Sequence, residues 1–331
     1  MLKRDGWRIG RVGVVVTVLA GVAVPWGPAA AKGVSLHTPA GHFNRPTVAF
    51  AAAGHVFVEN QDLSIVTIDA ATGAVQRYPV QAANIEVAVM GSELLVQNGP
   101  HEIDEYQVAT GAPIRAIRDE ALFVDGFTAT DGDLVVATGV TSTRVAVVNA
   151  VTGRVLRYLA YSFGSSAISL DMDATGDDVF FDGITTANDE PVDAVLEFSL
   201  STGKEVRAVA IRGHVTSPGP MAVTGPYLFV FDASAEGQDY VEFDAANGAY
   251  LRRLPVGGFM AADGANLYLV GGTTLSLLDL ATGATLKTFQ EPTFDDPAGA
   301  ALEDGHLFVG EPDSNEVTML NPSGAVLKQI R

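Results

Sequence analysis

Acidic residues in connecting segments are the side chains of this chain best suited to chemistry. Hard cations such as calcium prefer clustered carboxylate and carbonyl oxygens, and the same charges attract a lysine- or arginine-rich protein surface. We therefore predict that these residues bind a cationic group, either a divalent metal, for which calcium is the candidate, or a basic patch of another protein; no resident cofactor is predicted. A solvated rim without a specific ligand is the third interpretation. The candidate binding residues are Asp182, Asp189, Glu190, Asp193, His214, Asp232, Glu236, Asp239, Asp295, Asp296, Glu311 and Asp313.

Motifs for catalysis and metal binding are weak, so catalytic and metal-ligating residues stay unassigned. Asp171-x-Asp173-x-Thr175-Gly176 superficially matches a calcium loop, but it falls on a strand and hairpin turn of the repeat described below and has no flanking helices. The histidines lack zinc-site spacing, and the nucleophile-elbow, dinucleotide and phosphate-loop patterns are missing. The chain has no cysteine, which removes disulfides and thiolate chemistry.

A short turn of the form Asp/Asn-x-x-Thr-Gly, or a near relative, recurs along the chain. Its glycines are Gly73, Gly111, Gly153, Gly203, Gly248, Gly283 and Gly324. Four residues after each glycine stands a basic residue: Arg77, Arg115, Arg157, Arg207, Arg252, Lys287 and Lys328. The mean period is about 42 residues, which fits one propeller blade of four short strands. The sequence therefore predicts an all-β fold, a seven-bladed β-propeller of four-stranded antiparallel blades.

A second glycine in each period supports this count. It precedes an apolar run and predicts a tight hairpin between the first and second strands of each blade. These glycines are Gly54, Gly91, Gly132, Gly176, Gly225, Gly264 and Gly305. The Thr-Gly turn then joins the third strand to the fourth, which forms the outer edge of the blade. We interpret the basic residue on each outer strand as protection against pairing with another molecule.

Both sets of turns must lie on one face of the ring, because successive strands are antiparallel. Differences in length then accumulate on the opposite face, which we call the upper face. The two glycines of one blade are 19 to 27 residues apart, and the fourth blade is the longest because of the segment Asp182–Asp193. The fifth is next, with Asp232–Asp239. Variable loops on a constant scaffold predict that the upper face carries the specific contacts.

The chain begins with the features of an export signal over residues 1–31. Four basic residues precede an apolar run from Val12 to Val24, and Ala29–Ala31 suits cleavage. We divide the remainder into an N-terminal extension, 32–46, and the propeller, 47–331. The prediction is an exported protein, periplasmic or extracellular, without stable membrane insertion after cleavage; an uncleaved N-terminal anchor is the alternative.

The charge of the chain argues against nucleic acid as a partner. Without residues 1–31 the chain has 16 Lys and Arg against 38 Asp and Glu, a net charge of −22. Such a surface repels phosphate backbones and anionic membranes. Solubility and cation tolerance are the default explanation of this acidity, and attraction of a cationic partner is the alternative. The partner that we expect is another protein or a component of the cell envelope.

The repeats resemble those of YVTN-type and pyrroloquinoline-quinone-like β-propellers. The turns Asp69–Gly73, Asn149–Gly153 and Asp279–Gly283 carry the resemblance, and Phe243–Gly257 is similar to the YVTN form with its closing Pro-Val-Gly. The resemblance covers residues 47–331. Quinone-type repeats usually have tryptophan where this chain has its basic residues, and the adjacent cysteines of the quinone dehydrogenases are missing. The resemblance implies an interaction protein more often than an enzyme.

We therefore expect an exported binding or scaffolding module that recognises a protein or cationic ligand through its acidic upper face. The alternative is a metal-dependent propeller enzyme, similar to lactonases or lyases, with a site at the central channel. Such an enzyme needs polar residues on its inner strands, where this chain offers Glu86, Asp171 and Asp173.

Overall fold

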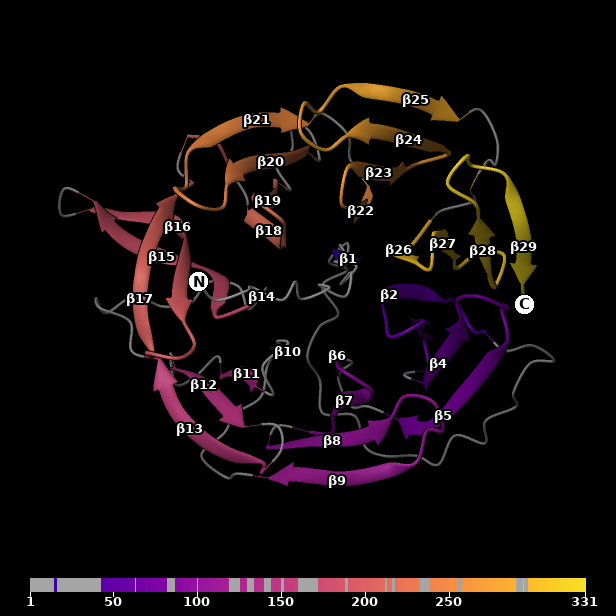
Figure 1. Cartoon of the computed structure of the whole chain (residues 1–331), viewed down its shortest axis with the longest axis horizontal. Coiled ribbons are helices and arrows are strands. Elements are labelled where there is room, and N and C mark those ends of the chain that lie inside the picture. The colour runs from indigo at the N-terminus through magenta and orange to yellow at the C-terminus, as the bar shows by residue number, and fades with distance from the viewer. Residues whose placement is uncertain are drawn as a thin grey trace, which may run out of the picture.

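A computed structural model of the chain shows antiparallel sheets arranged around a central axis (Figure 1). Every element assigned in the described residues is a strand. The described residues are 15–16, 43–62, 64–81, 87–99, 101–118, 126–129, 134–139, 144–149, 152–159, 172–187, 190–211, 213–215, 218–232, 239–254, 258–289, 294 and 297–331.

Each sheet is built from strands that follow one another in the sequence. The first is β2 (Thr47–Ala52), β3 (His55–Glu59), β4 (Ser64–Asp69) and β5 (Val75–Gln81). The second is β6 (Val87–Met90), β7 (Glu93–Gln97), β8 (Glu102–Gln107) and β9 (Pro113–Arg118). The third is β10 (Gly126–Ala129), β11 (Leu134–Gly139), β12 (Arg144–Asn149) and β13 (Arg154–Leu159).

The later sheets repeat this order. One is β14 (Met172–Thr175), β15 (Asp178–Ala187), β16 (Glu190–Ser199) and β17 (Lys204–Ala210). The next is β18 (Pro218–Thr224), β19 (Tyr227–Asp232), β20 (Asp239–Asp244) and β21 (Tyr250–Leu254). Then come β22 (Phe259–Asp263), β23 (Asn266–Gly271), β24 (Thr274–Asp279) and β25 (Thr285–Phe289). The last are β26 (Ala300–Glu303), β27 (His306–Glu311), β28 (Glu316–Leu320) and β29 (Val326–Ile330).

The prediction of four-stranded antiparallel blades in a propeller is confirmed, with one difference in strand number. Six sheets have four strands, and the sheet of β22 to β25 has five. Its added strand is β1 (Val15–Val16), which pairs with β22 near the central axis (Figure 1). β1 falls within the predicted export signal, so cleavage of that signal would leave four strands in this sheet too.

The Thr-Gly turns have the geometry that their residues predict. All seven turn glycines have positive φ, between 64° and 84°. In the turn after β24, Asp279 Oδ1 accepts hydrogen bonds from the Thr282 amide and hydroxyl, each at 2.7 Å. These bonds favour the charged carboxylate and lower the pKa of Asp279. The aspartate and threonine of the motif thus hold the turn, while the glycine supplies the left-handed conformation.

A β-bulge follows the turn in six of the sheets. Leu277 pairs with Lys287 and Leu278 with Thr285, which leaves Leu286 without an opposite residue. In each of these sheets the skipped residue is the apolar one three after the turn glycine, and it is 43–57% exposed: Ile114, Leu156, Val206, Leu251, Leu286 and Leu327. In the first sheet that position is Gln76, which pairs in register with Thr67. A bulge interrupts an edge strand and so discourages pairing with another molecule.

The basic residues after the turns also join neighbouring sheets. Five of the seven donate to a backbone carbonyl in the turn of the next sheet: Arg157 to Ser201, Arg207 to Ala245, Arg252 to Leu280 and Ala281, Lys287 to Ser323, and Lys328 to Thr72 and Gly73. The turn glycine provides the space, since a Cβ on Gly283 would lie 2.7 Å from Arg252 Nε. Edge protection is therefore only part of their role, because they also link the sheets.

Three of these arginines neutralise carboxylates buried in the third strand of their own sheet. Arg252 forms a two-point contact with Glu242, at 2.7 and 2.8 Å, and Glu242 is fully buried. Arg115 and Arg207 contact Glu105 and Glu197 in the same register. Burial raises the pKa of Glu242 although the Arg252 charge opposes the rise. An unpaired charge at such a place would be costly, so the pair must be kept together.

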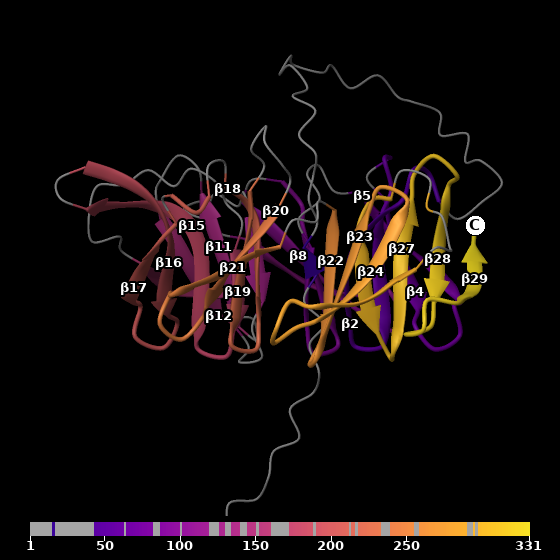
Figure 2. The same cartoon turned by 90° about the horizontal axis from the view of Figure 1, so that it is seen from above.

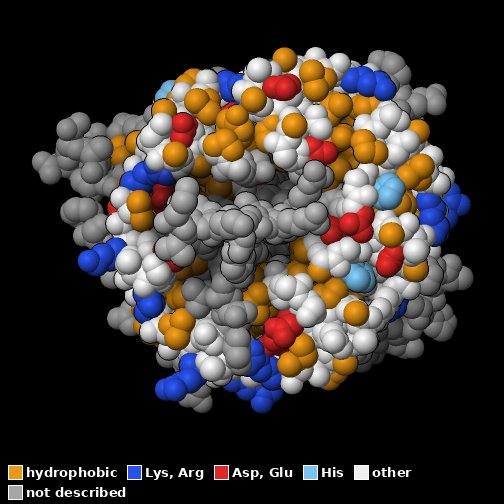
Figure 3. Space-filling view, viewed as in Figure 1, with side chains coloured by type: hydrophobic (Ala, Val, Ile, Leu, Met, Phe, Trp, Pro, Cys, Tyr) orange, Lys and Arg blue, Asp and Glu red, His pale blue; other side chains and the backbone are white. Residues whose placement is uncertain are grey.

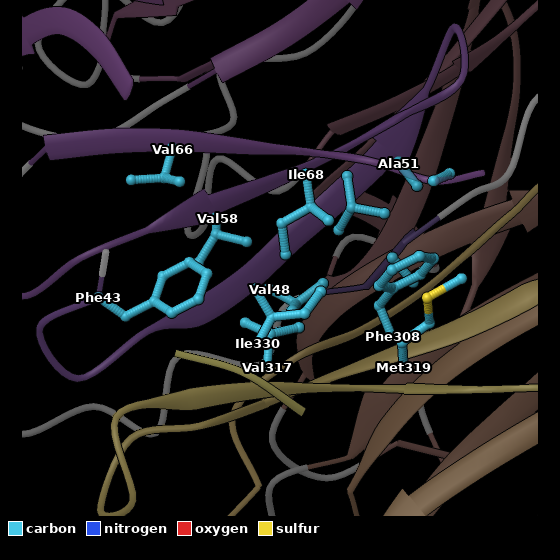
Figure 4. Packing of buried hydrophobic residues seen from close by; sticks show 13 residues of the cluster. Phe43, Val48, Ala51, Val58, Val66, Ile68, Phe308, Val317, Met319 and Ile330 are labelled. Carbon is cyan, nitrogen blue, oxygen red and sulfur yellow. The ribbon is translucent and has the colours of Figure 1, made fainter. Parts of the chain in front are cut away.

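The first and last sheets pack against each other and close the ring. Val48, Ile68, Phe308 and Ile330 belong to one buried cluster that spans both sheets (Figure 4). Phe43 of the N-terminal extension is buried in the same cluster. Closure therefore uses the same kinds of contact as the other junctions, with the extension added to them.

Candidate binding face

The upper face is reached by following each strand away from the glycine turns. Figure 2 shows the tight turns along the lower side and the hairpin of β15 and β16 projecting at the upper left. Figure 3 shows the opposite face, that of the glycine turns, where Lys and Arg side chains lie mainly at the rim and Asp and Glu are also found nearer the axis. The described outer strands β5, β9, β13, β17, β21, β25 and β29 contain eleven Lys and Arg and one acidic residue, Glu205.

Three of the predicted binding residues meet around Arg253. Its guanidinium contacts Asp232 Oδ2 at 3.0 Å and Asp239 Oδ2 at 3.2 Å, and it also donates to the carbonyl of His214. Asp232 is fully buried. The His214 ring stacks on Tyr250, with centroids 4.2 Å apart. These residues form one cluster, and its carboxylates are paired with a cation of the chain itself.

Two more predicted residues lie at the top of the last sheet. Asp313 Oδ1 contacts Arg45 Nη1 at 2.9 Å, and the Arg45 amide donates to Asn315 Oδ1 at 2.7 Å. Glu311 is buried and accepts a hydrogen bond from the Thr318 hydroxyl. These acids therefore fix the N-terminal extension and the end of β27, a role that the sequence analysis did not assign to them.

The segment Asp182–Asp193 is a strand hairpin and not the predicted loop. β15 continues through Asp182 to Ala187, and β16 starts at Glu190. The two strands stay in register along the whole extension, from Asp182↔Val195 to Ala187↔Glu190. Asp193 lies on β16, where its carbonyl accepts the Ile211 amide at 3.1 Å. The run of three β-branched residues, Ile184, Thr185 and Thr186, was the signal for a strand here.

Four predicted residues, Asp189, Glu236, Asp295 and Asp296, lie outside the described residues. Asp182 lies on β15, and Glu190 is the first residue of β16. Among the inner-strand acids, Asp173 is on β14 and accepts the Val223 amide at 2.6 Å, while Glu86 and Asp171 lie outside the described part. No group of three His, Asp or Glu side chains that could hold a metal occurs within the described part of the chain.

The sequence analysis missed Arg45 and Arg253, which neutralise acids of the upper face. A signal existed for the second: among the seven repeats, only the turn of Gly248 is followed by two adjacent arginines, Arg252 and Arg253. The upper face is thus divided into acids that are paired within the chain and a hairpin without any basic residue. Within the described residues, no helix is long and apolar enough to cross a membrane.

Comparisons with known proteins support the fold. No protein-family model matches the sequence, and no curated protein matches it. Among solved structures, the chain is similar to BamB from Moraxella catarrhalis, with a TM-score of 0.55, 14% identity, and 86% of this chain and 91% of that one covered.

Two further structures share the fold. Kuenenia stuttgartiensis hydrazine synthase gives a TM-score of 0.63 at 17% identity over 90% of this chain and 100% of that one. The computationally designed Ika8 protein gives 0.57 at 12% identity over 85% and 98%. At such identities the likeness concerns the fold alone, and these three proteins include a synthase and a designed chain. The protein is a β-propeller, and its function must be argued from the upper face.

Proposed function

We propose that the chain is an exported seven-bladed β-propeller, the five-stranded sheet counting as one blade, that binds another protein through its acidic upper face. The observation that carries the proposal is the distribution of charge. Basic residues are concentrated on the outer strands, whereas the projecting hairpin of β15 and β16 contains acidic residues and no Lys or Arg. Such a surface favours encounter with a basic partner.

A basic protein surface explains the face better than calcium does. Asp232, Asp239 and Asp313 are already paired with arginines of the chain, so a metal would have to displace them. We expect metal-stripped protein to give no saturable heat when titrated with calcium at millimolar concentration. Saturable heat would instead assign the face to metal binding.

The test of the binding function shortens the hairpin. Gly183 and Ala194 are opposite each other, so an Asn-Gly turn can join them when residues 184–193 are removed, and the register of the remaining strands is kept. Wild-type and shortened proteins are each cross-linked in a native cell-envelope extract. We expect a specific partner with wild type that is lost with the shortened protein.

The matched control is Asp304→Asn on the lower face, which removes a negative charge far from the hairpin and should leave capture unchanged. Asn tolerates the positive φ of 49° at this position. Equal capture by the wild-type and shortened proteins would contradict binding through the hairpin.

A further inference from the structure

The hairpin of β15 and β16 extends beyond both of its neighbours in the sheet. β14 pairs with β15 only up to Phe181, and β17 pairs with β16 only from Ala194. Between these limits the hairpin is a two-stranded ribbon that projects from the upper face (Figure 2). A ribbon of this kind has two edges, and each edge carries backbone groups that the ribbon itself does not use.

One printed hydrogen bond fixes which groups face outward. The Asp193 carbonyl accepts the Ile211 amide, so the backbone of Asp193 points away from β15. In an antiparallel pair, opposite residues either bond each other or both point away, and the two kinds alternate. Ile184 is opposite Asp193, and Thr186 is opposite Pro191. The amides and carbonyls of Ile184 and Thr186 therefore point away from β16. They lie on the edge of β15 that β14 covers closer to the glycine turns.

The two edges of the ribbon are not equivalent. On the β16 edge, the outward position is Pro191, which has no N–H to donate. On the β15 edge, the outward positions are Ile184 and Thr186, which are β-branched and favour strand pairing. Within the described residues, β14 begins at Met172, which is opposite Phe181, so this strand does not reach Ile184 or Thr186. The outer strands of the blades differ again, because most carry a bulge and each carries a basic residue.

We propose that the β15 edge at Ile184 and Thr186 is a docking site for an extended, lysine- or arginine-bearing segment of a partner protein, which adds to the sheet as a further strand. Main-chain hydrogen bonds give affinity in this mode of recognition. The inference rests on the proposed binding function and names its contact and partner class.

Charge decides between the two partners that could add a strand. The projecting part of β15 and β16 contains three acidic residues, Asp182, Glu190 and Asp193, and no basic one. A second copy of the chain would bring the same charges to the edge and be repelled. A cationic segment is attracted by them, so the partner strand is basic and belongs to another protein.

Hydrogen exchange on the whole chain is the first test. The probe is a short synthetic peptide in which lysine alternates with valine and threonine. We expect the amides of Ile184 and Thr186 to exchange fast in the free protein and to slow at least about tenfold with saturating peptide. Slow exchange without peptide would overturn the proposal, because it would show that the edge is already paired, whether by the chain itself or by a second copy.

A pair of variants separates the backbone contact from general attraction. Thr186→Pro removes the outward N–H and leaves the pairing of β15 with β16, just as Pro191 does on the other edge. Thr186→Val keeps the N–H and has nearly the same shape. We expect Thr186→Pro to weaken peptide binding about tenfold, the effect of one lost hydrogen bond, and Thr186→Val to bind as wild type does. Unchanged thermal unfolding of both variants shows that the fold is kept.

The outcomes distinguish this inference from the proposed function. If the envelope partner is lost on shortening the hairpin but is held equally by Thr186→Pro and Thr186→Val, the upper face binds and strand addition is wrong. If the shortened protein captures the partner as well as wild type does, the proposed binding through the hairpin is wrong, and strand addition at its edge is wrong with it. Sedimentation of the free protein as a dimer that Thr186→Pro dissociates would assign the edge to self-association and overturn the basic partner.

Discussion

Arg252 joins two blades and neutralises a buried acid with one guanidinium. It contacts both oxygens of Glu242 in its own sheet and the carbonyls of Leu280 and Ala281 in the next. Arginine can do this because its planar fork offers five donors in fixed directions. Lysine stands at the same position in the last two repeats, where the opposite residues are Leu277 and Met319 and no carboxylate. Both lysines donate to carbonyls, and Lys287 Nζ also lies 4.3 Å from the centroid of the Phe289 ring.

We predict that Arg252→Ala lowers the free energy of unfolding by about 3–5 kcal/mol, because it leaves the Glu242 charge buried and unpaired. Lys287→Ala is the matched control and should cost about 1–2 kcal/mol, the contribution of one hydrogen bond and of the cation–π contact with Phe289. Urea unfolding of both variants measures the difference. Equal losses would show that the buried carboxylate does not decide the stability of this junction.

Asp173 makes the stability of the fold depend on pH. Burial raises its pKa from 3.8 to about 6, although the amides of Val223 and Ala174 donate to it. The folded protein therefore holds this proton more tightly than the unfolded chain does, and stability falls as the pH rises from about 4 through 6.

Asp173→Asn should remove this dependence, because asparagine stays neutral and can still accept the Val223 amide. We expect the variant to be at least as stable as wild type at pH 7 and to gain less on acidification to pH 5. Thermal unfolding across this range is the measurement. A wild-type pH profile in the variant would contradict the assignment of the proton to Asp173.

At the scale of elements, the Thr-Gly turn also packs against the outer strand of the preceding blade. A Cβ on Gly324 would lie 2.2 Å from Phe289 Cδ1, whereas a Cβ on Gly264 would meet nothing within 4 Å. Both glycines have positive φ, 84° and 50°. The two turns thus share a backbone requirement and differ in the space around them.

We predict that Gly264→Ala costs about 1–2 kcal/mol, the usual penalty of the left-handed region. Gly324→Ala should cost at least about 1 kcal/mol more, because the added methyl group overlaps the Phe289 ring. Chemical denaturation of both variants tests this. Similar losses would show that Phe289 moves aside freely and that the close approach has no energetic role.

These elements also show what the sequence could reveal. The glycines and the basic residues recur at fixed spacing, so blades and turns were predictable from local rules. The bulge was not predictable, because a register shift depends on the opposite strand. Its only mark in the sequence was the apolar residue that precedes the basic one in six of the seven repeats. The hairpin at Asp182–Asp193 was taken for a loop since its extra length was visible and its pairing was not. The cluster at Arg253 brings together residues up to 39 positions apart, which composition cannot show.

For the whole molecule, stability should depend on closing the ring. β29 covers β28, all of whose residues are buried, and Lys328 reaches the turn of the first sheet. A chain that stops at Leu320 loses both contacts and should lack the cooperative thermal transition of the full chain. A chain without residues 1–31 should keep it, because the sheet that pairs with Val15 and Val16 retains its other four strands. Similar transitions in both would show that the ring tolerates an open seam.

The link from Lys328 to Gly73 repeats, across the two ends of the chain, the link from Lys287 to Ser323 within it. The five links run in the same rotational sense, each from one sheet to the sheet that follows it around the ring. The site at which the polypeptide starts and stops is therefore interchangeable in principle with any other junction. A circularly permuted gene, with new termini between β17 and β18, would encode a chain that forms the same ring of sheets with the same contacts between them.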